Sequence, residues 1–265
     1  LLIELDMVPD SFIYVSSLSI LGPLREQAVE PHDVALLSGT GASQEFIDTY
    51  TVKKSVYQQM TELDEPRPNT AYGESKLKSE KYLHRLAVEL EQAGKPKFPY
   101  VIFRPTGVYG PREMDYALMA KSIRQHVDFA VGYKPQEITF VYVQDLVDAI
   151  YAAVDKGVSG RTYFVSDGFV YSSRAFSDLI QRQLGVKRVL HITAPLWVLR
   201  CVSAVAETFS RMVGKTSTLN GDKYKIMKQR NWKCDITPLQ RELGFTPQWN
   251  LERGVKACAE WYKKI

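Results

Sequence analysis

The sequence predicts an α/β protein built around a parallel sheet. Short runs rich in β-branched and aromatic residues alternate with longer stretches of helical periodicity along its 265 residues. The first run, residues 11–16, is apolar at four successive positions between two serines, which is typical of a strand covered on both faces. These two observations favour a layered α/β fold over an all-helical or an all-β one.

Each predicted element follows from a local pattern. Residues 71–91 carry Leu77, Leu83, Leu86 and Leu90 near helical spacing, which predicts a long helix. The strand predicted at 99–104 ends because Pro105 cannot continue it. The other predicted elements are, in order, a strand at 11–16, a helix at 116–126, a strand at 138–143, a helix at 144–156, a strand at 161–165 and helices at 172–184, 238–243 and 251–263.

The composition is that of an ordinary globular protein, with 45% apolar and 24% charged residues. A net charge of +4 gives no reason to expect nucleic acid as a partner. Cys201, Cys234 and Cys258 form no C-x-x-C pair, which predicts buried free thiols in a reducing compartment, the cytoplasm. The four histidines show no ligand spacing, so no metal site is expected.

The most apolar stretch is residues 195–213. It carries Arg200, Glu207 and Arg211 and is short for a bilayer span. We therefore expect an amphipathic helix that covers a pocket, and no transmembrane segment. Shallow, peripheral contact with a membrane surface stays open as an alternative.

The sharpest chemical pattern is a Y-x-x-x-K motif formed by Tyr72 and Lys76 near the start of a predicted helix. Positions i and i+4 share one helix face, so a phenol and an ammonium can point at one spot. A free tyrosine has a pKa of about 10, and a neighbouring cation stabilises a phenolate. Such a pair suits proton transfer to or from a secondary alcohol. Alone the motif is weak, because tyrosine and lysine are common on surface helices.

Three further segments accompany this motif in a fixed order. A serine-rich strand end at 16–22 precedes it, the loop R-P-T-G-V-Y-G-P-R at 104–112 follows it, and F-V-Y-V-Q-D-L-V-D-A-I at 140–150 comes next. In this order the segments resemble the extended short-chain dehydrogenase/reductase superfamily, in its NAD-dependent epimerase/dehydratase group. The resemblance covers nearly the whole chain apart from residues 27–59. It implies an NAD(P)-binding Rossmann-type parallel sheet with a smaller C-terminal substrate domain.

The resemblance also implies roles for single residues. Tyr72 would be the catalytic acid/base, with Lys76 lowering its pKa and bonding the nicotinamide ribose. Ser17, five residues before Gly22, would hydrogen-bond the reacting oxygen, although without the family a backbone-capping role would be favoured. Asp145 is expected to brace the helix it starts rather than to touch substrate.

Further residues would line the cofactor and substrate sites. Pro105 and Val108 would pack on the nicotinamide, or would be a plain strand terminator and a core valine. Ser19, Gly107 and Arg112 would contact substrate, with a loop salt bridge as the alternative for Arg112. The resemblance implies NAD or NADP as cofactor without deciding between them.

Position 107 suggests a branch of the group. Many sugar-nucleotide enzymes carry Asn there, whereas Gly107, the apolar helix at 195–213 and the ending at 235–247 look more like the 3β-hydroxysteroid dehydrogenase branch. We therefore expect an oxidoreductase acting on a secondary alcohol of a sterol-like or sugar-like small molecule. The alternative is a nucleotide-sugar epimerase or dehydratase. A second alternative is a non-catalytic remnant or scaffold on the same fold.

The family opens with a strand, a glycine-rich turn and a helix that hold the pyrophosphate. No such unit precedes residue 11, and Leu1 is not a methionine, so we expect the chain to lack roughly 100 residues of the first Rossmann half. The run at 33–44 contains Gly39 and Gly41, but Gln44 stands at the third position, and it is not expected to bind phosphate.

The expected organisation is a partial dinucleotide-binding domain at 1–105 and a mainly substrate-binding part at 106–265, of which 138–165 returns to the sheet. Ser17 and Tyr72 stand 55 positions apart, about twice the separation expected of the family. Residues 27–59 are therefore expected to be an insertion, either a flap over the substrate pocket or a disordered excursion. A homodimer through the helix that bears Tyr72 is expected by analogy.

Overall fold

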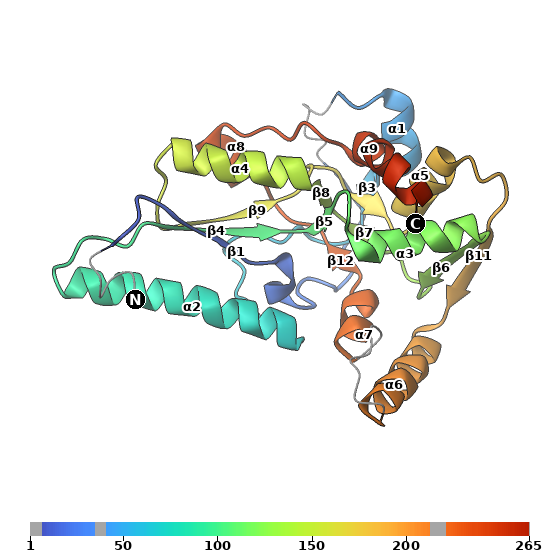
Figure 1. The fold of residues 1–265 in the computed structure, drawn as a ribbon, viewed down its shortest axis with the longest axis horizontal. Helices are drawn as coiled ribbons and strands as arrows, with labels where there is room; N and C mark the ends of the chain where they lie inside the picture. Colours follow the sequence, from blue (N-terminus) through green and yellow to red (C-terminus); the bar gives the residue numbers. More distant parts are fainter. Residues whose placement is uncertain (1–6, 35–40, 213–220, 265) are drawn as a thin grey trace.

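Two groups of elements lie side by side in the computed structural model, which describes residues 7–34, 41–212 and 221–264. In the first group, helix α2 (Ala71–Gln92) covers one face of a sheet, and α4 (Val143–Asp155) and α8 (Thr237–Leu243) cover the other (Figure 1). The second group contains α3 (Met114–Arg124), α5 (Ala175–Leu184) and α9 (Leu251–Lys264), and it holds the C-terminal end of the chain. The division at 105/106 stays a prediction.

The sheet of the first group confirms the predicted parallel architecture. Its strands run in the order β1 (Phe12–Val15), β4 (Tyr100–Pro105) and β9 (Arg161–Val165), all parallel. Every residue of β4 is buried because a strand lies on each side of it and helices cover both faces. β1, predicted to be buried, is instead half-buried, since among the described residues it has a neighbouring strand on one side only.

Short strands connect the two groups. β5 (Gly107–Tyr109) pairs with β8 (Phe140–Tyr142), and β7 (Glu137–Ile138) lies between β10 (Tyr171–Ser172) and β12 (Asn231–Trp232). The single strand predicted at 138–143 is thus two strands broken at Thr139. Its hydroxyl donates to the carbonyl of Trp232 at 2.6 Å. The helix predicted at 172–184 begins only at Ala175, because β10 ends at Ser172 and residues 173–174 form a turn.

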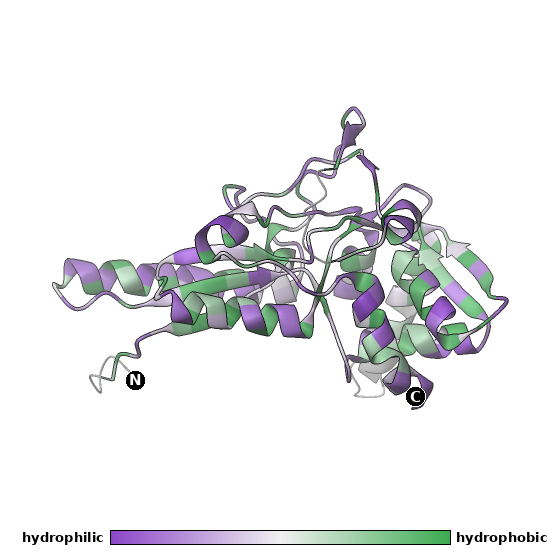
Figure 2. Ribbon diagram, turned by 90° about the horizontal axis from the view of Figure 1, so that it is seen from above, coloured by the Kyte–Doolittle hydropathy of each residue, from purple (hydrophilic) through white to green (hydrophobic). Residues whose placement is uncertain are grey.

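An aromatic core holds the second group together. Tyr109 is fully buried at its centre, and its hydroxyl donates to the carbonyl of Asn250 at 3.2 Å. Helix α9 passes this ring at Gly254, where a Cβ atom would lie only 2.1 Å from the Tyr109 oxygen. Position 254 must therefore be glycine for the helix to approach so closely. At the outer side of this group, β6 (Val127–Val131) and β11 (Leu190–Ala194) pair in parallel and carry both hydrophobic and hydrophilic residues (Figure 2).

The described residues of the predicted insertion form a small folded unit. β2 (His32–Asp33) and β3 (Lys54–Ser55) are antiparallel, and α1 (Gln44–Tyr50) buries Phe46 in the aromatic core. The Lys233 ammonium donates to Ser55 Oγ and to the Tyr57 carbonyl, both at 2.5 Å. The expectation of a disordered excursion is wrong for these residues, because they pack against and form hydrogen bonds with residues of the C-terminal half. Gly39 lies outside the described residues.

Helices α6 (Leu196–Met212) and α7 (Gly221–Lys228) project at the lower edge of Figure 1. No helix in the described part of the chain is long and apolar enough to cross a membrane. Cys234 and Cys258 are buried as predicted. Cys201 is exposed instead, because it lies on α6, which projects from the rest of the structure. Peripheral membrane contact by α6 stays a prediction.

Candidate active site

Most predicted site residues meet at one cavity of about 460 Å³, at the carboxyl ends of β1 and β4. Residues after β1, at the end of β4 and on α2 line one part of it, and residues of α3, α5, α7, β7, β8 and β12 line most of the rest. The predicted residues that line it are Ser17, Ser19, Tyr72, Pro105, Gly107 and Val108. Residues 55 positions apart in the sequence are therefore brought to one place by the crossover from β1 to β4. Ligands of open α/β sheets bind at such strand ends.

Tyr72 and Lys76 lie together on one face of α2. The helix begins at Thr70, whose hydroxyl accepts the Gly73 N–H at 3.0 Å, so Tyr72 stands in the first turn. The Tyr72 side chain is half exposed, at 51%. The Lys76 ammonium lies 5.8 Å from the centre of the Tyr72 ring and donates to the Val15 carbonyl at 2.8 Å. This bond fixes the cation beside the phenol at the end of β1.

Ser17 caps the backbone at the start of a short helical turn and also lines the cavity. Its Oγ accepts the Ser19 N–H at 3.2 Å at the start of the 3₁₀ turn η1 (Leu18–Leu21). The hydroxyl proton of Ser17 stays available to donate to a bound oxygen. The hydroxyl of Ser19 is buried and has no hydrogen-bond partner in the described part of the chain. Both hydroxyls can therefore bond to a ligand.

A buried ion pair that the sequence reading missed orients α2. Arg104 and Glu80 are bidentate, with N–O distances of 2.6 Å and 3.1 Å, and both side chains are almost completely buried. Arg104 belongs to β4, so the pair fastens the helix with Tyr72 to the strand that carries Pro105. The available signal was the position of Glu80, four residues after Lys76 on the same helix face.

Arg112 does not line the cavity. It lies in a left-handed backbone conformation with φ of 74°, is exposed, and forms no ion pair with any described residue. Its predicted contact with substrate stays a prediction without support from the geometry. Asp145 also stands apart from the cavity and accepts the N–H groups of Gln248 and Trp249, both at 3.0 Å. Burial raises the pKa of this carboxyl, which braces the chain before α9.

The second group of elements supplies the rest of the wall, and most of it is apolar. The lining residues that the sequence reading did not find include Tyr116, Met119, Phe140, Phe176, Ile226, Met227 and Trp232. Two acids also line the cavity, and both have partners. Glu113 accepts the N–H groups of Asp115 and Tyr116 at the start of α3, and Asp115 is paired with Lys223. The described lining contains no lysine or arginine.

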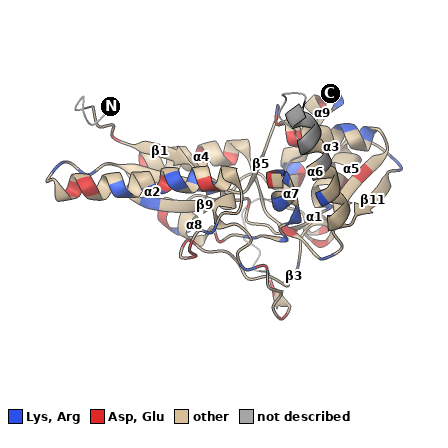
Figure 3. Cartoon of the chain, turned by 90° about the horizontal axis from the view of Figure 1, so that it is seen from below, with Lys and Arg blue, Asp and Glu red and all other residues tan. Residues whose placement is uncertain are grey.

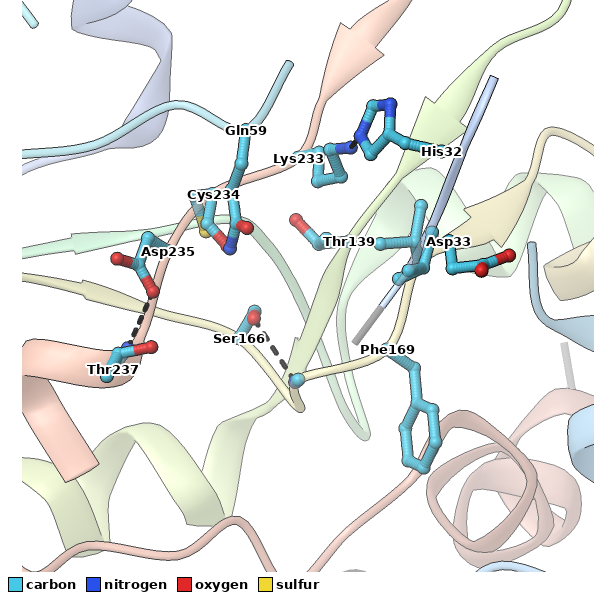
Figure 4. A pocket seen from close by; sticks show the side chains of 13 residues that line it. His32, Asp33, Gln59, Thr139, Ser166, Phe169, Lys233, Cys234, Asp235 and Thr237 are labelled. Carbon is cyan, nitrogen blue, oxygen red and sulfur yellow. Dashed lines mark hydrogen bonds between the residues drawn. The ribbon is translucent and has the colours of Figure 1, made fainter. Parts of the chain in front are cut away.

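The insertion borders a different, smaller cavity of about 180 Å³. Its lining is polar and includes His32, Asp33, Gln59 and Ser166, with the Lys233 side chain directed at His32 (Figure 4). No described residue of 27–59 lines the cavity that contains Tyr72. The expected flap over the substrate pocket is therefore wrong for these residues. Among the described residues, no group of three or more His, Cys, Asp or Glu could hold a metal ion.

The sequence matches the model of a known protein family. Residues 6–166, more than half of the chain, match the model of the NAD dependent epimerase/dehydratase family. The chain belongs to this family. The resemblance inferred from the Y-x-x-x-K motif and its neighbours is thereby confirmed.

Curated members of the epimerase/dehydratase family are similar at low identity. The chain is 25% identical over 215 residues to dTDP-D-glucose 4,6-dehydratase of Mus musculus, covering 79% of this chain and 52% of that protein. It is 26% identical over 207 residues to dTDP-L-rhamnose 4-epimerase of Burkholderia thailandensis, covering 74% of this chain and 47% of that protein. The chain thus spans about half the length of these relatives.

Solved structures of the epimerase/dehydratase type share the fold. UDP-glucose 4-epimerase of Thermotoga maritima, solved with UDP-glucose, has a TM-score of 0.64 at 19% identity, covering 98% of this chain and 66% of that one. The dTDP-glucose 4,6-dehydratase of Bacillus anthracis, in complex with NAD, has a TM-score of 0.60 at 16% identity, covering 95% and 61%. These likenesses confirm the predicted α/β fold with a Rossmann-type parallel sheet.

Proposed function

We propose that the protein carrying this chain catalyses NAD- or NADP-dependent hydride transfer at a secondary alcohol of a nucleotide-linked sugar. One observation carries the proposal: Ser17 and Tyr72 line the same cavity as Pro105 and Val108, with Lys76 fixed beside Tyr72. A proton carrier, an oxygen-binding hydroxyl and an apolar platform are thus gathered at one sheet edge, as hydride transfer to or from a carbinol requires.

Three residues of the chain have different roles at the carbinol. The Tyr72 phenol takes the hydroxyl proton during oxidation and returns it during reduction. The Lys76 ammonium stabilises negative charge on the phenol oxygen. The Ser17 hydroxyl, whose acceptor side is used by the Ser19 N–H, donates to the reacting oxygen and orients it. Most of the described wall around them is apolar.

The residues present fit a nicotinamide cofactor. Pro105 and Val108 offer an apolar surface for a flat ring. The Ser16 hydroxyl, one residue before Ser17, is buried with no partner in the described part of the chain. Lys76 uses one of its three N–H donors on Val15, which leaves others for a ribose hydroxyl. NAD or NADP, when bound, supplies the hydride acceptor. Complexes of the Bacillus anthracis dehydratase with NAD and of RMD from Pseudomonas aeruginosa with NADPH support either cofactor.

The relatives, rather than Gly107, support our choice of substrate class. The named curated relatives are a dTDP-glucose dehydratase and a dTDP-rhamnose epimerase, and no comparison favours a sterol-like substrate specifically. We therefore place the nucleotide-sugar epimerase or dehydratase before the sterol-like reading. A dehydrogenase of apolar carbinols is kept as the second candidate because the described cavity lining is mostly apolar and contains no lysine or arginine.

The test is the substitution Tyr72→Phe in the protein that carries residues 1–265. It removes the proton carrier and keeps the ring, so turnover should fall by at least about 100-fold. Since the Tyr72 side chain is half exposed, the melting temperature should change little. Conversion of dTDP-glucose, UDP-glucose and a 3β-hydroxysterol is measured by product analysis with NAD+ and with NADP+. Tyr82→Phe, which removes another exposed hydroxyl of α2, is the matched control.

The outcomes separate the candidates. Loss of sugar-nucleotide conversion in Tyr72→Phe but not in Tyr82→Phe supports the proposal. Conversion of the sterol alone moves the second candidate to first place. Turnover of Tyr72→Phe equal to that of the wild type would sink the mechanism, and a protein that converts none of the probes favours a non-catalytic member of the fold.

A further inference from the structure

The cavity has no side chain at position 107 because a tyrosine occupies the space. A Cβ atom built on Gly107 would lie 2.8 Å from the Tyr116 hydroxyl oxygen and 3.0 Å from Cδ1 of Phe140. Gly107 does not have a positive φ, so its conformation does not demand glycine. The requirement is spatial: a residue with a side chain at 107 would displace the Tyr116 hydroxyl.

The Tyr116 ring is held firmly in this position. It stacks on Phe176 with 4.3 Å between ring centres and an angle of 8° between ring planes. It also stands edge-on to Phe140 and Tyr109, at 6.1 Å and 6.3 Å. Contacts with three rings leave the tyrosine little freedom to turn, so its hydroxyl stays at the cavity wall beside Gly107.

The hydroxyl held there has no hydrogen-bond partner in the described part of the chain, although the residue lines the cavity. Burial raises the pKa of the Tyr116 phenol well above its usual value, so at neutral pH it can both donate and accept. Across the same cavity the Ser19 hydroxyl is buried and unpaired in the described part of the chain. Buried polar groups are normally paired, so the unpaired Ser19 hydroxyl, in the same cavity as the Tyr116 hydroxyl, points to a ligand that bonds to both.

We propose that Tyr116 is a specificity-determining residue of this cavity. Its hydroxyl takes the place of the side chain that Gly107 lacks and, together with the Ser19 hydroxyl, bonds two oxygen atoms of a polyhydroxylated ring. The inference deepens the proposed function and rests on it only in placing the sugar ring in this cavity. Ser19 belongs to the sheet-forming part of the chain and Tyr116 to the second group, so the ring is held between them.

The surroundings favour a neutral hydroxylated ring over other ligands. Glu113 and Asp115 lie in the wall. Lys223 pairs with Asp115, but no described residue forms an ion pair with Glu113, so an anionic group is disfavoured beside Glu113. A wholly apolar ligand would leave the hydroxyls of Ser19 and Tyr116 unpaired. A sugar ring satisfies both demands, because its hydroxyls pair with these groups while its C–H faces contact Phe140 and Phe176.

The test compares ligands that differ only in the sugar. The affinities of UDP-glucose against UDP, and of dTDP-glucose against dTDP, are measured by calorimetry for the wild type, Tyr116→Phe and the control Tyr82→Phe. We expect the sugar to add affinity in the wild type and in the control. In Tyr116→Phe this gain should fall on the order of tenfold, as for one lost hydrogen bond to a buried group. Ser19→Ala should produce a similar loss.

Gly107→Ala provides an independent check, since its methyl group pushes the Tyr116 hydroxyl aside without removing it. It should weaken the sugar-dependent affinity in the same way, with a melting temperature that shows the variant is folded. A sugar-dependent gain that is unchanged in Tyr116→Phe, or absent in the wild type, would overturn the inference. Because binding needs no turnover, loss of activity in Tyr72→Phe with intact binding separates this inference from the proposed mechanism.

Discussion

At the scale of single residues, Glu62 shows how burial without a partner affects stability. One of its carboxylate oxygens is buried and has no hydrogen-bond partner among the described residues. Burial is the main cause that raises the pKa of Glu62 to about 7; Arg161 opposes this shift and Glu242 contributes to it. The folded state therefore holds the Glu62 proton more tightly than the unfolded chain does, for which the ordinary value is 4.5.

This shift predicts a pH-dependent loss of stability. The folded state binds more protons than the unfolded state between about pH 4.5 and pH 7, so stability falls as pH rises through this window and stays lower above it. Glu62→Gln removes the charge and should raise the melting temperature at pH 8 by a few degrees, at about 2–4 °C per kcal/mol, with a smaller effect at pH 5. The exposed neighbour Glu65→Gln is the control. Equal effects of Glu62→Gln at both pH values would contradict the prediction.

At the scale of elements, the Arg104–Glu80 pair determines how α2 sits on β4. Removing one partner leaves an uncompensated buried charge, so Glu80→Ala should destabilise the fold by about 3–5 kcal/mol. The exposed pair of Arg85 and Glu89 on the same helix is the control, and Glu89→Ala should cost under about 1 kcal/mol. Urea unfolding measures both variants. A cost for Glu80→Ala as small as that of the control would show that the pair does not hold the helix.

Elements with a strong local pattern were predictable from the sequence. β9 has the predicted bounds and α2 differs by one residue at its end, because leucine spacing and β-branched runs encode them directly. The strands β5 and β12 were missed because two or three residues carry too little pattern. β6 and β11 were missed because polar residues, Asp128 in β6 and His191 and Thr193 in β11, interrupt their apolar runs. Along α2, acidic and basic residues are interspersed (Figure 3), and Tyr82 and Val88 are exposed. A homodimer through this helix stays a prediction.

The site residues, too, were only partly predictable from the sequence. The residues of the Y-x-x-x-K motif and its neighbouring loops were identifiable because their order along the chain resembles a family. Tyr116, Phe176 and Trp232 were not, because they reach the cavity only through packing of the second group. No sequence pattern indicates that the Tyr116 hydroxyl occupies the space beside Gly107. Such a contact can be recognised only in the three-dimensional structure.

At the scale of the whole molecule, cofactor affinity depends on more than the catalytic residues. The described residues contain no strand, glycine-rich turn and helix of the type that binds a pyrophosphate. We therefore expect NAD+ or NADP+ at about 1 mM to raise the melting temperature of residues 1–265 by less than about 1 °C, since stabilisation requires a ligand concentration well above Kd. Differential scanning calorimetry measures this, with AMP as a control ligand. A rise of several degrees would show that the residues around Lys76 and Pro105 suffice.

The contact between Tyr109 and Gly254 has a consequence for the evolution of the chain. Tyr109 belongs to the loop motif that identifies the family, whereas Gly254 stands in α9, far along the sequence. Because a Cβ atom at 254 would fall inside the tyrosine ring's volume, a substitution at 254 is compatible only with a smaller residue at 109. Among related sequences the two positions should therefore vary together, and the last helix inherits a constraint from a motif nearly 150 residues before it.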